Sequence, residues 1–221
     1  MKSVYFKANE GGKEFTTYLK GIFNGLENKQ KDYQWLISDI DCYPQNEKFN
    51  RMTDQKYCWI SGEELTKMID EEDFQWVWAT FSAFDPQTTL MEVLQYPLPE
   101  CLNNYQFYID NPQIQHPLAE MEIDAIDSSF TVFFSNDPQW AEKIMHAYPS
   151  AKDLHLKNQS ENALVKRISQ YVENSSSDLY KKFIIEQPWK RFQIARTFLE
   201  NPEEEISDEM IERALNNELP K

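Results

Sequence analysis

The clearest folding signal in the chain is residues 120–156, EMEIDAIDSSFTVFFSNDPQWAEKIMHAYPSAKDLHL. Apolar residues alternate with acids over 121–125 and recur at every second position over 130–134, which predicts two strands joined by a short polar turn. The pair Asp137-Pro138 then predicts a helix, because Asp is a favoured cap and proline fits the first helical turn. No catalytic motif occurs in this stretch.

The same two periodicities organise the rest of the chain. Alternation predicts strands at residues 2–7, 33–41, 57–60, 74–84, 105–109 and 154–156. Helical spacing predicts helices at residues 13–26, 138–148, 163–171, 179–185, 188–199 and 207–215, and a further helix after the capping box that starts at Ser61. Residues 9–12 are read as a turn, and residues 42–56 as a loop because they are polar and show no clear period.

Residues 74–84, FQWVWATFSAF, are apolar on both faces of the predicted strand. Simple alternation places Trp76 and Trp78 on one face, and Ala79 and Phe81 on the other. A strand of this kind is typically central and covered on both sides. We therefore expect the centre of the sheet here.

These elements predict an α+β fold, with a mixed, largely antiparallel sheet, packed helices and a helical C-terminal block. The spacing of apolar residues changes after Leu156, from every second position to helical spacing. We therefore expect a sheet domain at residues 1–156 and a helical extension or subdomain at residues 157–221, with breaks at 175–177 and Pro202.

The charge of the chain is strongly negative and unevenly spread. Formal net charge is −15 over 221 residues, and residues 68–142 contain fourteen acids and no Lys or Arg. Such a field repels nucleic acid and anionic membranes and attracts basic partners, although acidity can also serve solubility alone. An odd number of cysteines without CxxC spacing, and a charged start, predict a soluble cytoplasmic protein.

The candidate binding residues are the acids of the 121–125 strand region. Glu120, Glu122 and Asp124 lie on one face of an ideal strand, about 7 Å apart from one to the next. Tyr108 could join them if residues 105–109 form a neighbouring strand. An exposed face of acids and a tyrosine would suit a basic partner. The alternative is a solvated outer face with no partner.

The sequence predicts no catalytic, cofactor-binding or metal-binding residues. Asp39 and Asp41 alternate on a strand, but the calcium-loop pattern is absent, and the histidines lack zinc spacing. No GxSxG motif occurs, and nothing in the sequence places Cys58 or Cys101 beside a histidine. Basic and aromatic residues between 181 and 196 could bind nucleic acid, but a helix face that docks on an acidic surface of this chain or of a copy suits them better.

We therefore expect a non-enzymatic acidic binding protein that neutralises or sequesters a basic protein partner. In composition alone the chain is similar to many bacterial immunity proteins. Two alternatives stay open, a structural component of a larger assembly and an enzyme with dispersed carboxylates. A concave pocket with converging ionisable groups would favour the enzyme, and an acidic patch with aromatics would favour the binder.

Overall fold

The computed structural model describes residues 1–7, 17–102, 104–200 and 206–219. The chain divides into two compact units, Met1–His155 and Leu156–Lys221, and each is described by itself below. The predicted turn at 9–12 and the first part of the predicted helix at 13–26 lie outside the described residues. The fold is α+β, as the sequence predicted.

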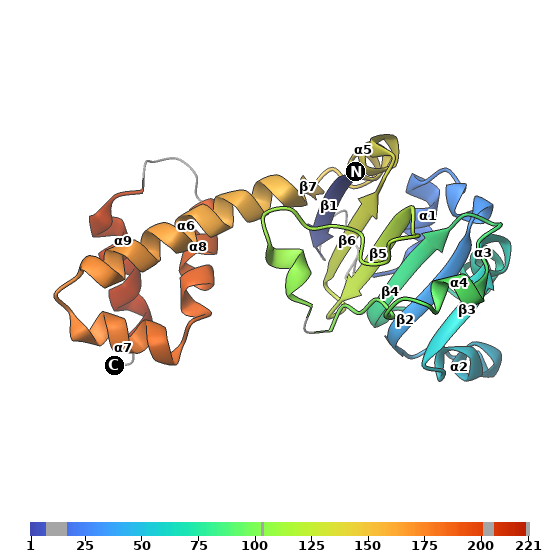
Figure 1. Ribbon diagram of the computed structural model, residues 1–221, viewed down its shortest axis with the longest axis horizontal. Helices are drawn as coiled ribbons and strands as arrows, with labels where there is room; N and C mark the ends of the chain where they lie inside the picture. The colour runs from blue at the N-terminus through green and yellow to red at the C-terminus, as the bar shows by residue number, and fades with distance from the viewer. Residues whose placement is uncertain (8–16, 103, 201–205, 220–221) are drawn as a thin grey trace. The chain divides into compact units, whose positions relative to one another are not determined.

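A seven-stranded sheet forms the first unit, and every neighbouring pair of strands is antiparallel (Figure 1). The strands are β1 (Lys2–Lys7), β2 (Gln34–Cys42), β3 (Tyr57–Ser61), β4 (Trp76–Phe84), β5 (Met121–Ile126), β6 (Phe130–Ser135) and β7 (Lys152–Asp153). Their order in the sheet is β3-β2-β4-β5-β6-β1-β7. The prediction of an interior strand at 74–84 is confirmed, since β4 lies between β2 and β5.

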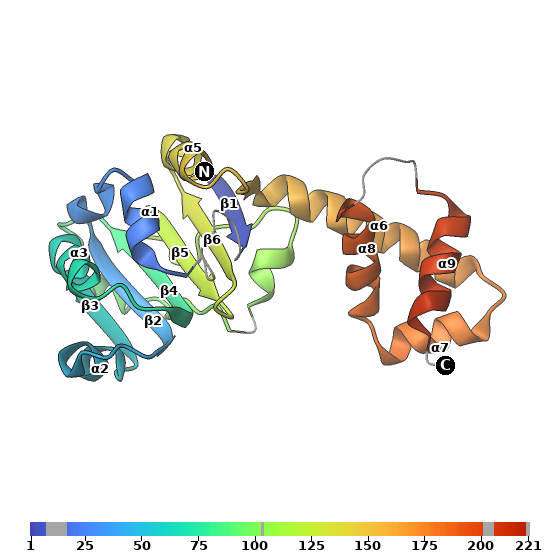
Figure 2. The same cartoon turned by 180° about the vertical axis from the view of Figure 1, so that it is seen from behind.

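Helices cover one face of this sheet, as Figures 1 and 2 show for α1 (Leu19–Gly25), α3 (Gly62–Glu71) and α5 (Pro138–Ala147). The predicted caps of the last two are confirmed. Ser61 and Glu64 form a reciprocal capping box at α3, and the Asp137 side chain accepts from the Gln139 amide at α5.

The pairing of β2 with β4 has two irregularities, and one of them changes which way the tryptophans of β4 point. Ser38 pairs with Thr80, but Asp41 pairs with Trp78 and Cys42 with Trp76. The first shift adds a residue to β2, and the second adds one to β4 between Trp78 and Trp76, which reverses the alternation of side chains within β4. Trp76 is therefore in the helix-covered core with Phe81, at 4.8 Å between ring centroids, while Trp78 packs on the other face. The predicted shared face of Trp76 and Trp78 is wrong.

The other face of the sheet is covered by residues 85–119, which we call the covering segment (Figure 1, green). Its described residues, 85–102 and 104–119, contain only the short helix α4 (Leu90–Val93) and the 3-10 helix η3 (Tyr105–Tyr108). The predicted strand at 105–109 is therefore wrong. The Asn104 side chain caps η3 by accepting from the Gln106 amide, and only Phe107 of the four helical residues is buried.

Two further predictions, a loop at 42–56 and a strand at 154–156, are wrong. Residues 42–56 contain helix α2 (Glu47–Thr53), which the Asn46 side chain caps at the Lys48 amide. A short 3-10 helix, η2 (Lys29–Asp32), also precedes β2. The predicted strand at 154–156 is instead the start of helix α6, and β7 ends at Asp153.

The second unit consists of helices and short connections over its described residues. Its helices are α6 (Leu154–Asn174), α7 (Asp178–Glu186), α8 (Lys190–Glu200) and α9 (Asp208–Glu218). The first two residues of α6 belong to the first unit, since the second unit starts at Leu156. One apolar cluster joins all four helices, with Ile168, Phe183, Ile194 and Ile211 among its buried members. The helical C-terminal block and the break at 175–177 are as predicted.

We expect Trp76→Ala to lower the free energy of unfolding of the chain by about 3–5 kcal/mol, because it removes a fully buried indole from the core. Urea unfolding followed by circular dichroism measures this loss. Tyr43→Ala removes an exposed ring from the same unit and should change the free energy by no more than about 0.5 kcal/mol. A loss below about 1 kcal/mol for Trp76→Ala would contradict the packing described here.

Candidate functional site

Two acids of β5 lie beneath the covering segment. Glu122 pairs with Ser82 across the β4–β5 ladder, and Asp124 pairs with Thr80. Both acids have 0% exposed surface. Because an ionised carboxylate is costly to bury without partners, the surroundings of these two side chains must supply donors or a proton.

The covering segment and β4 supply the donors. The backbone amide and the side-chain amide of Gln115 donate to the two oxygens of Glu122, at 3.0 and 3.2 Å. Thr80 Oγ1 donates to Asp124 Oδ1 at 2.8 Å. Gln115 also accepts from the backbone amide of Glu100 at 3.0 Å, so the side chain links the buried acid to the surface of the segment.

Burial favours the protonated forms of both carboxyl groups. Asp124 Oδ2 is buried and has no hydrogen-bond partner among the described residues. A buried carboxylate oxygen without a donor is costly, so a proton on this group lowers the cost of burial. Burial raises the pKa of Glu122 to about 7 and, together with the charge of Glu122, raises the pKa of Asp124 well above its usual range.

A third acid fastens the covering segment to β2. Asp39 lies at the first β2 irregularity with a positive φ of 51°, which few residues other than Gly, Asn and Asp tolerate. Its Oδ2 accepts from the backbone amides of Cys101 and Leu102, at 2.8 and 2.6 Å. The adjacent Ser38 hydroxyl donates to the Pro99 carbonyl at 2.6 Å. Residues 99–102 are thus held on the sheet by a bulge that aims a carboxylate at them.

An open pocket of about 400 Å³ lies in the covering segment. Glu100 is the one acid among its lining residues, and Tyr96 and three prolines contribute apolar surface. The remaining polar lining consists of amides, from Asn104, Gln106, Gln113 and Gln115. Since Gln115 also bonds Glu122, one wall of the pocket rests on the buried carboxyl pair.

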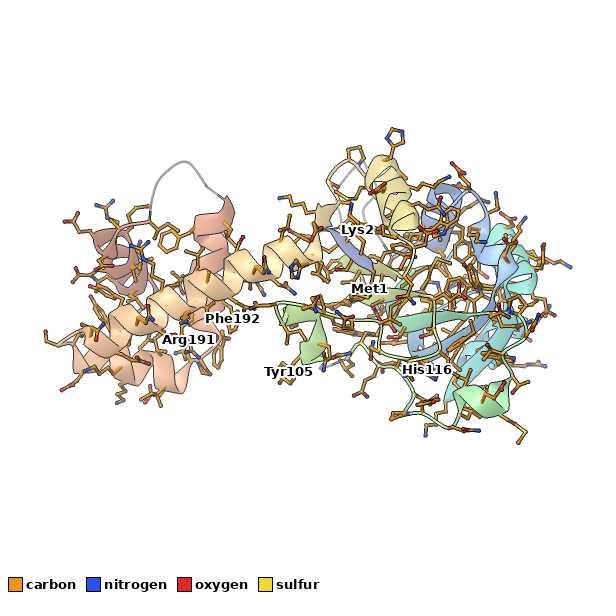
Figure 3. The ribbon with its side chains drawn as sticks, turned by 45° about the horizontal axis from the view of Figure 1, so that its top comes forward. Met1, Lys2, Tyr105, His116, Arg191 and Phe192 are labelled. Carbon is orange, nitrogen blue, oxygen red and sulfur yellow. The ribbon has the colours of Figure 1, made fainter. Side chains whose placement is uncertain are left out.

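His116 and Cys101 are structural members of this face. The His116 Nδ1 accepts from the Leu118 amide, so Nε2 carries the proton and donates to the Val93 carbonyl. Burial lowers the pKa of His116, which agrees with this neutral ring. Burial likewise raises the pKa of the Cys101 thiol, beside Asp124 and Asp39, so this thiol is not an activated nucleophile. Figure 3 labels the enclosed His116 and the outward-facing Tyr105.

The predicted exposed face of Glu120, Glu122, Asp124 and Tyr108 is wrong. Glu122 and Asp124 are buried, while Glu120 is exposed and its side chain is hydrogen-bonded to the Tyr33 hydroxyl. Tyr108 lies in η3 and is 39% exposed. The four residues therefore present no common surface to a partner.

The correct placement had a signal in the sequence. β4 is apolar on both faces, so a layer had to cover each face, and a strand that pairs with β4 is covered by the same layers. Residues 85–119 connect β4 to β5 and were long enough for that role, although a strand was predicted at 105–109 within them. The hydrogen-bond partners of each acid could not be predicted from the sequence. Thr80 and Ser82 are far from the acids in the chain, and Gln115 belongs to no recognisable motif.

The other candidate residues are not brought together into a metal site. Asp39 bonds the covering segment, as described, and the described residues contain no group of three or more His, Cys, Asp or Glu suited to a metal ion. In the basic and aromatic stretch, Lys190 pairs with Glu218 and Arg196 with Glu161 inside the second unit. No helix of the described residues has the length and apolarity to cross a membrane.

The fold and site thus define an α+β protein in which an irregular segment closes one sheet face over paired acids. The chain belongs to the family described as "Protein of unknown function (DUF2691)", whose model matches residues 1–163. This match covers the first unit and continues into α6. Comparisons with curated proteins and with solved structures gave no match.

We expect the free energy of unfolding to fall as the pH rises from about 5 to about 8, because the pKa of Glu122 is about 7 in the folded chain and 4.5 is its ordinary value. Between those values the folded chain binds more protons than the unfolded chain. The contribution is complete below the ordinary pKa and is lost as the pH rises through the folded one. Urea unfolding at a series of pH values measures this slope.

Asp124→Asn should flatten that slope, since the amide donates permanently to Glu122 where Asp124 needs a proton. Glu100→Gln removes a carboxylate from an exposed position and serves as the control, with the wild-type slope retained. A stability that rises over the same pH range in the wild type would show that the pair ionises freely.

Proposed function

We propose that this chain is a binding protein whose covering segment receives a basic, partly apolar segment of a partner protein. One observation carries the proposal: a surface with acids and exposed apolar side chains but no Lys or Arg. Asp85, Glu92, Glu100 and Asp110 of the segment are exposed. Of the fourteen exposed large apolar residues in the described chain, eight belong to this segment, namely Met91, Leu94, Tyr96, Leu102, Tyr105, Tyr108, Ile109 and Leu118.

These groups suit the two steps of protein association. Acids without neighbouring bases attract a cationic partner over distance, which mainly raises the association rate. Tyrosines then supply large contact areas with a polar end, and Tyr105 is 81% exposed. The amides of the pocket can donate to and accept from the backbone of an extended chain. The proposed partner is therefore a basic segment with apolar residues.

The same geometry argues for binding rather than catalysis. Glu122 and Asp124 have no exposed surface, and Glu100 is the one acid among the pocket's lining residues. The Cys101 thiol is held neutral by burial. An active site would require ionisable groups that converge in the pocket, and this pocket lacks that arrangement among its lining residues.

The test measures binding of a fluorescent peptide of alternating lysine and leucine to the whole chain by anisotropy. We expect binding that weakens as salt is added, because exposed charges are screened. Tyr105→Ser combined with Glu100→Gln should weaken binding about tenfold, the equivalent of about 1.4 kcal/mol. The corresponding peptide of glutamate and leucine should not bind.

Tyr43→Ser is the matched control, because Tyr43 is an exposed tyrosine beside Asp41 and outside the covering segment. It should leave the affinity for the peptide unchanged. Equal loss in the control and in the Tyr105/Glu100 variant, or equal binding of both peptides, would reject the covering segment as the binding surface.

A further inference from the structure

Helix α7 in the second unit has two apolar faces. Tyr180, Phe183 and Ile184 pack into the core of the unit. Leu179 and Ile185, on the outer face, are 57% and 80% exposed, and Trp189 just beyond the helix is 58% exposed. One apolar stripe is enough to pack a surface helix on its own unit, so the outer stripe has no role within it.

Large apolar side chains left exposed in this way mark an interaction surface more often than single scattered ones do. Leu179, Lys182 and Ile185 follow one another at steps of three residues within α7, which places them along one side of the helix. Trp189 adds a further exposed ring just beyond the end of the helix. The partner must therefore present an elongated apolar strip with charges that match those beside it.

The charges beside the apolar stripe are complementary to the same charges in a second, antiparallel copy of α7. Lys182 and Glu186 lie on the exposed side of α7, with 3.8 Å between Nζ and Oε1. If two copies of α7 pack antiparallel about a two-fold axis level with residue 184, Lys182 of each copy faces Glu186 of the other. In the same register Leu179 faces Trp189 of the second copy, and Ile185 lies beside the axis. An isologous interface requires this self-complementarity.

The charge of the chain also favours contact through the second unit. Residues 1–155 contain twelve Lys or Arg and twenty-five Asp or Glu, whereas residues 156–221 contain ten and twelve. Two copies that meet through α7 thus associate through the unit whose own charges nearly balance, so repulsion between like charges of these units opposes association little.

We propose that the outer face of α7 is the interface of a two-fold symmetric homodimer, with the two α7 helices antiparallel. The nine residues of α7 span about 13 Å, so the contact is smaller than the roughly 1,600 Å² of a standard interface. Association is therefore concentration-dependent, with a dissociation constant on the order of micromolar. The dimer does not depend on the peptide-binding surface proposed for the first unit.

Sedimentation equilibrium of the full chain over a range of concentrations tests this dimer. The wild type should pass from monomer to dimer, and Ile185→Asp should remain monomeric, because it places two carboxylates beside the axis. Leu156→Asp makes the same kind of change at a 60% exposed position of α6 and should dimerise like the wild type. Circular dichroism establishes that each variant is folded.

A charge exchange tests the register. Lys182→Glu and Glu186→Lys should each raise the dissociation constant about tenfold, because each single variant places two like-charged pairs across the axis. The variant with both substitutions should dimerise like the wild type. A wild type that stays monomeric at every concentration, a dimer that survives Ile185→Asp, or a double variant as weak as the single ones would overturn the proposal.

Discussion

Glu122 and Asp124 need donors and a proton because neither carboxyl group has any exposed surface. A regular helix could not supply them as the covering segment does, since helical backbone amides are already bonded within the helix. An irregular segment keeps its amides available, and those of Cys101, Leu102 and Gln115 all bond to carboxylates of the sheet. The lack of regular structure in residues 85–119 is thus a consequence of the polar groups beneath it.

The polar groups also divide the apolar packing on this face. One cluster gathers around Phe107, Val132 and Phe134, and another around Phe84 and Val93. Ser38, Thr80, Glu122 and Asp124 lie on the strands between these clusters. Because hydrogen bonds require specific geometry where apolar contacts do not, this polar row fixes the position of the covering segment more tightly than packing alone would.

The sequence predicted what depends on local pattern. Alternation identified the first six strands, and the caps at Ser61 and Asp137 marked two helix starts correctly. The errors came from competing local signals, as at Asn46 and Asn104, whose side chains start helices in stretches read as loop and strand. The acids were misplaced for another reason: alternation tells which residues share a face, but whether that face is covered depends on residues far away in the chain.

The position of β1 in the sheet has a consequence for how the chain folds during synthesis. Residues 2–7 leave the ribosome before the other strands of the sheet, yet β1 pairs with β6 and β7, whose residues are made much later. Val4 and Phe6 are fully buried in the finished sheet, so the nascent chain must carry them unpaired until residues 130–135 of β6 have been translated. Pairing between strands so distant in sequence is intrinsically slow, because a long loop must close first. The strands from β2 through β6 can pair beforehand, and β1 is then enclosed between β6 and β7.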